Sequence, residues 1–258
     1  VQCVRLGALV SFIGAVGVDE RGTSCVDNLV REGIDCSVAV VDRPTGLGVV
    51  NLLTSGAVVA TVAQGANLEV TDALVDRHID HFSDLSFLLL QNEIAESGIR
   101  RAMDIARERE VRIVYNAAPA TSFTLAVAPQ CDVLIVNEEE AMACLGRRLA
   151  GLAELSTGAL ELAAYGPDVV VTLGERGALV CTGGQVTHLP AWTVEPVDTT
   201  GAGDSFVGAF TVAVMRGLEP VSAARSAIGV AAMTTKGRGA QTSMPRAFPP
   251  EEGADASR

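Results

Sequence analysis

Short apolar segments alternate with segments of helical length from about residue 83 onward. The apolar segments are "LSFLLLQ", "VRIVYN", "CDVLIVN" and "DVVVTLG". Between them lie "ESGIRRAMDIARERE", a stretch that begins "EEEAMACLG", and "LAELSTGALELAAYG". Strands that alternate with helices are joined by right-handed crossovers, which align the strands in parallel and cover both faces of the sheet. The pattern therefore predicts an α/β fold with a doubly wound, mainly parallel sheet, whose ligands lie beyond the carboxyl ends of the strands.

The region before residue 83 consists of short segments typical of β-strands. These are "CSVAVVD", "GLGVVNLL" and "GAVVATV", and the "TSG" between the last two is typical of a hairpin turn. We expect antiparallel strands at approximately 36–62, forming a small lid or interface sheet. One domain is expected over 1–246. Residues 247–258 lack apolar periodicity and are predicted to be a flexible tail.

Composition and charge limit the classes of partner. The chain has 258 residues, 48% of them hydrophobic, and a formal net charge of −12. A nucleic-acid or anionic-membrane surface would need clustered Lys and Arg, so neither partner is expected. The longest apolar runs are shorter than the roughly 20 residues of a membrane helix, and Val1 is not followed by a signal-like segment. We expect a cytoplasmic protein that binds small molecules.

The cysteines and histidines do not form a recognisable metal motif. The six cysteines are scattered without a CxxC pair, so we expect free thiols. His78 and His81 stand three apart beside Asp80 and could share a helix face. A solvated helix end is the preferred interpretation, because no third group of ligands accompanies them.

A helix with a glycine-rich first turn is predicted within "DTTGAGDSFVGAFTVAVMRG" at 198–217. Its apolar stripe, spaced at i, i+3, i+4, i+7 and i+8, is Phe206, Ala209, Phe210, Ala213 and Val214. The first turn falls on Gly201, Ala202, Gly203 and Asp204, where the backbone N–H groups have no partner within the helix. Such groups, with the helix dipole, form an anion site suited to phosphate or to the charge on a transferring phosphoryl group.

Asp204 is the unexpected residue of this first turn, because a carboxylate beside an anion site would repel phosphate. It is better explained as a general base that accepts the proton of a substrate hydroxyl lying between it and a γ-phosphate. The alternative is an ordinary first-turn acid that is favourable for the helix dipole, and the motif alone leaves both open. The chain has neither GxGxxG at this point nor GxxxxGK[ST] anywhere, so dinucleotide and Walker-type sites are not expected.

Further segments, in the same order along the chain, resemble the ribokinase-like (PfkB) sugar kinases. They are "GAN" at 65–67, "LLLQNEI" at 88–94, "NAAPA" at 116–120, "NEEEA" at 137–141, "VVVTLGERGALV" at 169–180 and "TKGRGAQTSMP" at 235–245. The resemblance runs from about residue 4 to 246. It implies ATP-dependent phosphate transfer to a sugar hydroxyl, with D-ribose giving D-ribose 5-phosphate as the first expectation, and a homodimer formed through the β-lid. Another sugar or nucleoside kinase, or a non-catalytic binding protein, is the alternative.

The resemblance also implies roles for individual residues. Asp204 would be the base and contact the sugar, with the backbone at 201–203 as the anion hole. Glu93, at the end of an apolar strand, resembles a carboxylate that binds a sugar hydroxyl. Asn137 and Glu140 resemble an NxxE pair that helps hold Mg²⁺ and phosphates, Glu140 acting on Mg²⁺ through water. Asn137 also suits a helix N-cap, and it can play both parts.

Two further groups of residues are assigned by resemblance. The nucleotide would contact the strand end and turn formed by Thr172, Leu173, Gly174, Glu175, Arg176 and Gly177, together with Asn137, Gly203 and Ile228. A K⁺ ion would be held by oxygens of Asp198, Thr200, Thr234, Gly237, Gly239 and Ser243. The plain alternative for both groups is a glycine-bounded turn. Ile228 stands where ribokinases often carry a polar residue, which predicts a more apolar contact with adenine.

The start of the chain departs from the family. "VQCVRLGA" resembles the end of a helix that family members place after a first strand with sugar-binding groups and after part of the lid. We therefore expect that the sequence is partial, that the first strand and part of the lid lie outside it, and that the identity of the sugar is its least defined property.

Overall fold

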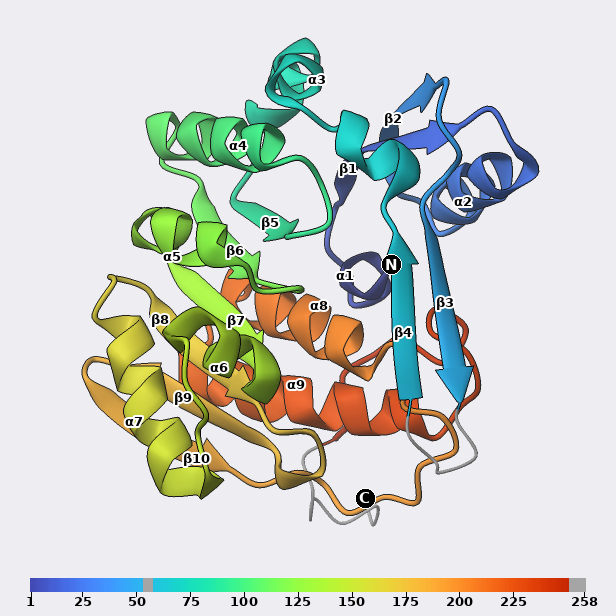
Figure 1. The fold of residues 1–258 in the computed structure, drawn as a ribbon. Helices are drawn as coiled ribbons and strands as arrows, with labels where there is room; N and C mark the ends of the chain where they lie inside the picture. Colours follow the sequence, from blue (N-terminus) through green and yellow to red (C-terminus); the bar gives the residue numbers. More distant parts are fainter. Residues whose placement is uncertain (53–57, 251–258) are drawn as a thin grey trace.

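The computed structural model describes residues 1–52 and 58–250, and Figure 1 shows helices on both sides of a central sheet. The strands are β1 (Ser11–Gly17), β2 (Asp35–Val41), β3 (Leu47–Leu52), β4 (Val58–Ala63), β5 (Phe87–Gln91), β6 (Arg112–Asn116), β7 (Val133–Asn137), β8 (Asp168–Thr172), β9 (Ala178–Thr182) and β10 (Gln185–Leu189). The α-helices are α1 (Gln2–Arg5), α2 (Glu20–Arg31), α3 (Asp72–Arg77), α4 (Glu96–Glu108), α5 (Ser122–Val127), α6 (Glu138–Leu145), α7 (Gly151–Ala163), α8 (Ala202–Met215) and α9 (Pro220–Thr235). Short 3₁₀ helices are η1 (Gly65–Glu69), η2 (Ile79–Phe82), η3 (Ala128–Gln130) and η4 (Gly174–Arg176).

The central sheet has the strand order β10-β9-β8-β7-β6-β5. The pairs β5–β6, β6–β7 and β7–β8 are parallel, whereas β8–β9 and β9–β10 are antiparallel. Each parallel pair is separated in the chain by helices, as the alternating pattern requires. The predicted doubly wound, mainly parallel sheet is therefore confirmed.

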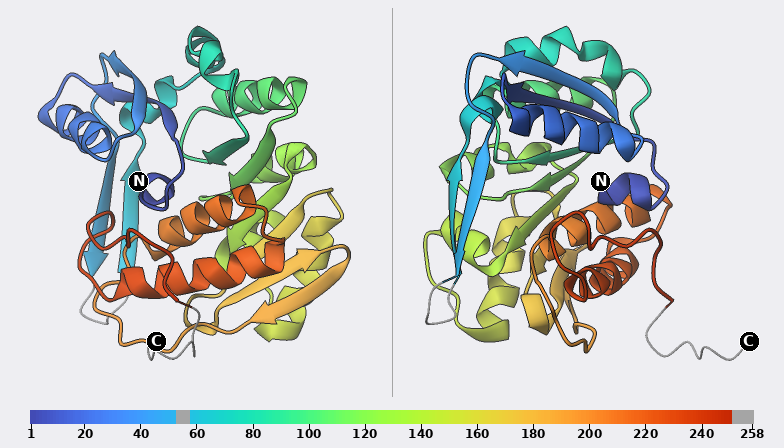
Figure 2. Two further views of the ribbon diagram at one scale, coloured as in Figure 1. Left: turned by 180° about the vertical axis from the view of Figure 1, so that it is seen from behind. Right: turned by 90° about the vertical axis from the view of Figure 1, so that its right-hand side faces the viewer.

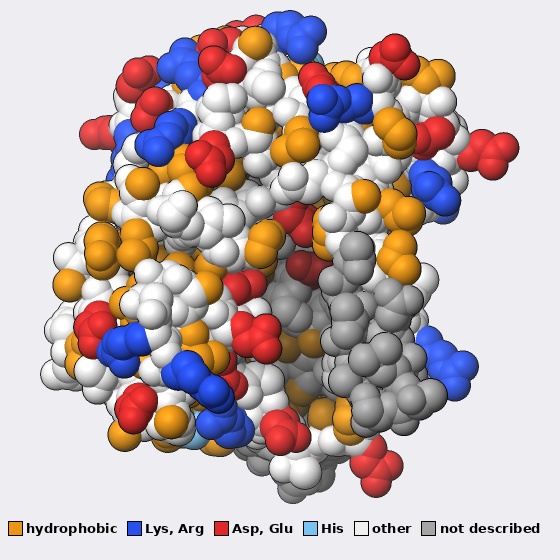
Figure 3. Space-filling model, in the orientation of Figure 1, with side chains coloured by type: hydrophobic (Ala, Val, Ile, Leu, Met, Phe, Trp, Pro, Cys, Tyr) orange, Lys and Arg blue, Asp and Glu red, His pale blue; other side chains and the backbone are white. Residues whose placement is uncertain are grey.

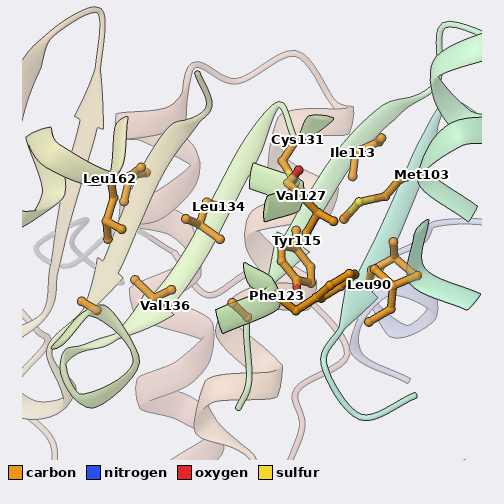
Figure 4. Close-up of a cluster of buried hydrophobic side chains, with 14 of the residues drawn as sticks. Leu90, Met103, Ile113, Tyr115, Phe123, Val127, Cys131, Leu134, Val136 and Leu162 are labelled. Atoms are coloured by element: carbon orange, nitrogen blue, oxygen red, sulfur yellow. Dashed lines mark hydrogen bonds between the residues drawn. The ribbon is translucent and has the colours of Figure 1, made fainter. Parts of the chain in front are cut away.

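Alternate residues of the central strands supply two separate apolar clusters, one on each face of the sheet. On β6 and β7, Ile113 and Leu134 belong to the cluster under α4 and α7, whereas Val114 and Ile135 belong to the cluster under α8 and α9. Figure 4 shows part of the first cluster, with Tyr115 and Phe123 between the sheet and its helices. Strands buried on both faces read as continuous apolar runs, which explains "RIVY" and "VLIV".

The predicted lid differs from the structure in its first strand. Residues 36–41 were expected to be antiparallel, but β2 pairs in parallel with β1, from Ser11 opposite Asp35 to Gly17 opposite Val41. The reason is α2, which lies between the two strands and returns the chain to the same end of the sheet. Asp19 caps that helix by accepting a hydrogen bond from the Gly22 amide.

The antiparallel pair is β3 with β4, which stands to one side of the central sheet (Figure 2). Leu47 lies opposite Ala63 in its register, and the "TSG" turn falls outside the described residues. Towards the other end of the chain, Phe248 lies near Arg216, which follows α8 directly, and Pro249 lies near Gly229 of α9. Residues 248 and 249 of the predicted tail therefore lie against α9 and the end of α8. No helix in the described ranges is both long and apolar enough to cross a membrane.

Candidate active site

A hollow with acidic side chains around it lies near the middle of the face shown in Figure 3. In the same orientation, the carboxyl ends of β5, β6 and β7 and the first turn of α8 converge on this region (Figure 1). Parallel strands direct their carboxyl ends to one edge of a sheet, where side chains from different strands can meet a ligand. Residues far apart in the sequence are therefore brought together at this edge.

The first turn of α8 begins where the apolar stripe predicts. Gly201 is the N-cap and has a left-handed backbone with φ of 80°. A Cβ at this position would lie 3.0 Å from the carbonyl oxygen of Ala240, so glycine is required both by its φ angle and by the close approach of the 237–245 loop. The Ala202 amide already donates to Thr199 O at 3.2 Å. Of the three predicted amides, Gly203 is consequently a better candidate for the anion hole than Ala202.

Asp204 in this turn faces Gln91 at the end of β5, and Gln91 in turn contacts Asn116 at the end of β6. Gln91 Nε2 lies 3.5 Å from Asp204 Oδ1 and 3.2 Å from Asn116 Oδ1, and Asn116 Nδ2 donates to Ile135 O at 3.1 Å. The Ile135 carbonyl thus fixes the orientation of the Asn116 amide, which in turn orients Gln91 towards the carboxylate. Gln91 and Asn116 were not among the predicted site residues. Both are polar residues that end apolar strands, and this position is the sequence signal that could have indicated them.

The two predicted substrate carboxylates, Asp204 and Glu93, are brought close enough to influence each other. Desolvation raises the pKa of Glu93, and the charge of Asp204 raises it further. Desolvation also raises the pKa of Asp204, opposed by the Gln91 hydrogen bond. A carboxyl with a raised pKa accepts a proton more readily, which suits a general base.

Asn137 and Glu140 form a reciprocal cap at the start of α6. The Glu140 amide donates to Asn137 Oδ1 and the Asn137 amide donates to Glu140 Oε2, both at 2.8 Å. The N-cap interpretation of Asn137 is confirmed. Burial raises the pKa of Glu140, while the Asn137 amide lowers it. Among the described residues, no three or more His, Cys, Asp or Glu side chains gather as a metal site, and this includes His78 and His81.

The strand end and turn at 172–177 connect β8 to β9 through η4. Gly177 has φ of 91°, and a Cβ there would meet Leu189 O at 1.9 Å. Gly174 and Glu175 are exposed, Thr172 is half-buried and Arg176 forms an ion pair with Glu138 of α6. Leu173 belongs to the apolar core, and Ile228 is only 6% exposed within the cluster under α8 and α9. These two residues therefore offer little side-chain surface to a nucleotide.

The predicted cation ligands come together beside the start of α8. Asp198 Oδ1 accepts from the Thr200 amide at 2.9 Å, and its Oδ2 accepts from the Gly239 amide at 2.8 Å. Hydrogen bonds from the Thr200 side chain and from these two amides lower the pKa of Asp198 to about 2.

The other residues of this group also make contacts within the protein. Ser243 Oγ donates to Gly239 O at 2.5 Å, and its side chain lies close to Gly237. Thr234 is buried, and its hydroxyl lies 2.8 Å from Ser205 Oγ of α8 and 3.0 Å from Val230 O. The Thr234 side chain therefore binds within the core rather than facing the loop.

Known proteins resemble this chain over most of its length. The family model described as "pfkB family carbohydrate kinase" matches residues 1–247. The chain is 31% identical to ribokinase from Bacillus subtilis and 28% identical to deoxyribokinase from Salmonella typhi, covering 95% of this chain and 81% of each relative. A structure of Arabidopsis thaliana ribokinase complexed with ribose and ATP superposes with a TM-score of 0.86 at 25% identity, covering 95% of this chain and 81% of that one.

Proposed function

The chain belongs to the pfkB family of carbohydrate kinases and is an ATP-dependent sugar kinase, and from this premise we propose that its acceptor is D-ribose, giving D-ribose 5-phosphate. One observation supports the proposal most strongly. Asp204 lies in the first turn of α8 and shares one edge of the sheet with Glu93, so the proposed base, the proposed sugar ligand and the proposed anion site are close together. Ribokinases and a deoxyribokinase are both similar to the chain, so the sugar is the finer part of the proposal.

In the proposed reaction, Asp204 accepts the proton of the attacking sugar hydroxyl. Gln91 holds the carboxylate from the side of β5 and, by donating a hydrogen bond, favours its charged form before the sugar binds. The hydroxyl oxygen forms a bond to the γ-phosphorus of ATP while the bond to the β-phosphate oxygen breaks. The Gly203 amide and the positive end of the α8 dipole stabilise the charge on the transferring phosphoryl group.

Glu93 selects and orients the sugar in this proposal. Its half-buried carboxylate accepts hydrogen bonds from hydroxyl groups other than the one that attacks. Without a ligand, the charged form of Glu93 is unfavourable, because its carboxylate and that of Asp204 repel each other in one partly desolvated site. Hydrogen bonds from sugar hydroxyls offset that repulsion, so the site favours a polyhydroxylated acceptor over an apolar one.

ATP is the co-substrate, and we place it along the exposed part of the 172–177 turn. Mg²⁺ would neutralise the phosphate charge, held by Glu140 through water, with Asn137 beside it; the capping box leaves oxygen lone pairs of both side chains for this role. K⁺ would bind the oxygen-rich group around Asp198 and the 237–245 loop, an all-oxygen donor set that suits a hard cation. We also propose a homodimer through β3 and β4, where Val49 and Val62 are exposed.

Release of ADP over a panel of pentoses, hexoses and nucleosides, with and without K⁺, tests the acceptor and the cation. D-ribose is expected to give the highest kcat/KM, and K⁺ to raise it. The variant Asp204→Asn is expected to lose at least about a hundredfold in kcat, the scale of a missing general base. Glu93→Gln is the companion variant and is expected to raise the KM for the sugar more than it lowers kcat. Near-normal kcat in Asp204→Asn would refute the role of the base.

A further inference from the structure

The Arg5 side chain, at the end of α1, is buried between two segments that are distant in the sequence. Its side chain is 8% exposed and that of Glu32, at the end of α2, is 16% exposed. Arg5 Nε donates to Glu32 Oε2 at 3.0 Å, and Nη2 pairs with the other carboxylate oxygen. From its opposite side, Nη1 donates to Gln241 O at 2.5 Å and Met244 O at 2.8 Å. One guanidinium therefore joins α2 to the 237–245 loop.

The same short helix makes a second contact to this loop and packs on α8. Gln2 Nε2 donates to Pro245 O at 3.0 Å, so α1 side chains bind three carbonyl groups of the loop. The Gln2 side chain also lies against Gly208 of α8, and Arg216, which follows α8 directly, donates to Leu6 O. Figure 2 shows α1 beside α8 and the C-terminal loop. The loop is consequently fastened to the helix whose first turn carries the active site.

The loop in turn contacts the first turn of α8 and the segment before it. The Gly239 amide donates to Asp198, which also binds the Thr200 amide. Gly201, the N-cap of α8, lies so close to Ala240 that a Cβ would come within 3.0 Å of its backbone. A shift of the loop would therefore alter the turn that presents Gly203 and Asp204.

The composition of the 237–245 loop makes its order dependent on hydrogen-bond donors from other parts of the protein. The sequence "GRGAQTSMP" contains two glycines and only one buried apolar side chain, Met244, and segments with few apolar contacts open locally at low cost. Arginine presents donors in a planar fork that can bind a carboxylate and carbonyl groups at once, which the single ammonium of lysine cannot reproduce. Removing the Arg5 side chain would leave Glu32 as a poorly solvated charge without its main partner.

We propose that Arg5, oriented by Glu32, is a positioning residue that holds the 237–245 loop against the first turn of α8 and thereby sets the geometry of phosphoryl transfer. The part that concerns transfer rests on the proposed function. The part that concerns the loop does not, because it is a statement about which contacts order residues 237–245. The two parts can be measured separately on the full-length protein.

Hydrogen exchange followed by mass spectrometry tests the loop in Arg5→Met, Arg5→Lys and the wild type. The loop peptide in Arg5→Met is expected to exchange at least about tenfold faster, whereas peptides from β6 and β7 keep their rates. The exchange rate of the loop peptide in Arg5→Lys is expected to lie between the rates in Arg5→Met and in the wild type. Arg246→Met is the matched control, because Arg246 also pairs with Glu32, at 3.4 Å, but its side chain is 72% exposed and it is not among the residues bound to the loop carbonyls.

Steady-state kinetics then tests the effect on catalysis. The kcat of Arg5→Met is expected to fall by about tenfold to a hundredfold, as for a small misplacement of reacting groups, while the KM for the sugar changes less than about threefold. Arg246→Met is expected to keep the wild-type kcat. A loss of thermal stability without faster loop exchange would indicate a purely structural role and overturn the proposal.

Two outcomes separate this inference from the proposed function. If no sugar supported turnover but the Arg5→Met loop exchanged faster, the function would be wrong and the positioning of the loop would stand. If Arg5→Met did not fold, Arg5→Lys and Glu32→Gln would carry the test. Unchanged loop exchange in both of those variants would refute the inference.

Discussion

At the scale of single residues, the active-site edge contains charges whose pKa values are moved in opposite directions. Desolvation raises the pKa of Asp204 and Glu93, whereas hydrogen bonds lower the pKa of Asp198 to about 2. The first two carboxyls lie at the candidate active site, and the third accepts hydrogen bonds from backbone amides. Environment rather than residue type therefore separates a candidate base from a carboxylate that orders a loop.

Gln91→Leu tests the electrostatic role of the β5 side chain. Gln91 donates to the charged form of Asp204 and so lowers the pKa of that carboxyl; without it, the pKa rises further above its ordinary value. Because the base must be unprotonated, kcat/KM falls as pH falls through this pKa. The acid limb of the profile of kcat/KM against pH is expected to move to higher pH in the variant. A limb at the wild-type position would contradict this role of Gln91.

Asp19→Asn tests the carboxylate that caps α2, which is not one of the candidate site residues. Asp19 binds the Thr45 amide at 2.8 Å, the Thr45 hydroxyl at 2.7 Å and the Gly22 amide at 2.8 Å, which lower its pKa to about 2. Its contribution to the free energy of unfolding is therefore present above the unfolded pKa of about 4 and is lost as pH falls towards 2.

Urea unfolding at a series of pH values measures this contribution. Asp19→Asn is expected to be less stable than the wild type at pH 7, and the difference is expected to shrink between pH 4 and pH 2. A difference that stayed constant over this interval would mean that the charge of Asp19 does not contribute.

At the scale of elements, the contact of α1 with α8 depends on glycine at position 208, which has no side chain. A Cβ on Gly208 would lie 2.8 Å from Gln2 Cβ, which is closer than carbon atoms pack. Because α1 also carries Arg5, this contact connects the helix of the active site to the 237–245 loop. Close approach, rather than backbone freedom, accounts for glycine here, since 208 lies inside a regular helix.

Gly208→Ala is expected to lower the free energy of unfolding by about 1–3 kcal/mol, the cost of overpacking, even though alanine is the better helix former. Thermal and urea unfolding measure the change. Gly48→Ala is the control, because a Cβ there meets no atom within 4 Å. Equal stability of Gly208→Ala and the wild type would show that α1 moves aside without cost.

At the scale of the whole molecule, ligand binding should increase the free energy of unfolding. A ligand that binds only the folded protein stabilises it, by about 2.7 kcal/mol at a hundred times its Kd. For a chain of this size each kcal/mol corresponds to about 2–4 °C in Tm.

ATP with D-ribose is therefore expected to raise Tm by about 5–10 °C. ATP with 2-deoxyribose is expected to raise it less, because this sugar lacks the 2-hydroxyl group that could donate a hydrogen bond to the site. Differential scanning fluorimetry with each sugar, with and without a non-hydrolysable ATP analogue, measures this. An equal rise for both sugars would remove the support for ribose as the preferred acceptor.

The positions of the central strands β5–β8 and the start of α8 followed from the sequence. Strand and helix periods are local properties, so apolar runs and the 206–214 stripe located β5–β8 and α8. The candidate base followed as well, because Asp204 belongs to the first turn of that helix. The Asn137 cap was predictable for the same reason, since its partner is three residues away.

The tertiary structure decided what depends on residues distant in the chain. It paired β2 in parallel with β1, oriented Gln91 towards Asp204 through Asn116, and placed Arg5 on the 237–245 loop. No period or short motif encodes these contacts, because each arises only when separate elements pack on the same sheet. The sequence by itself determined which chemical groups this kinase carries, whereas packing determined which of them act together.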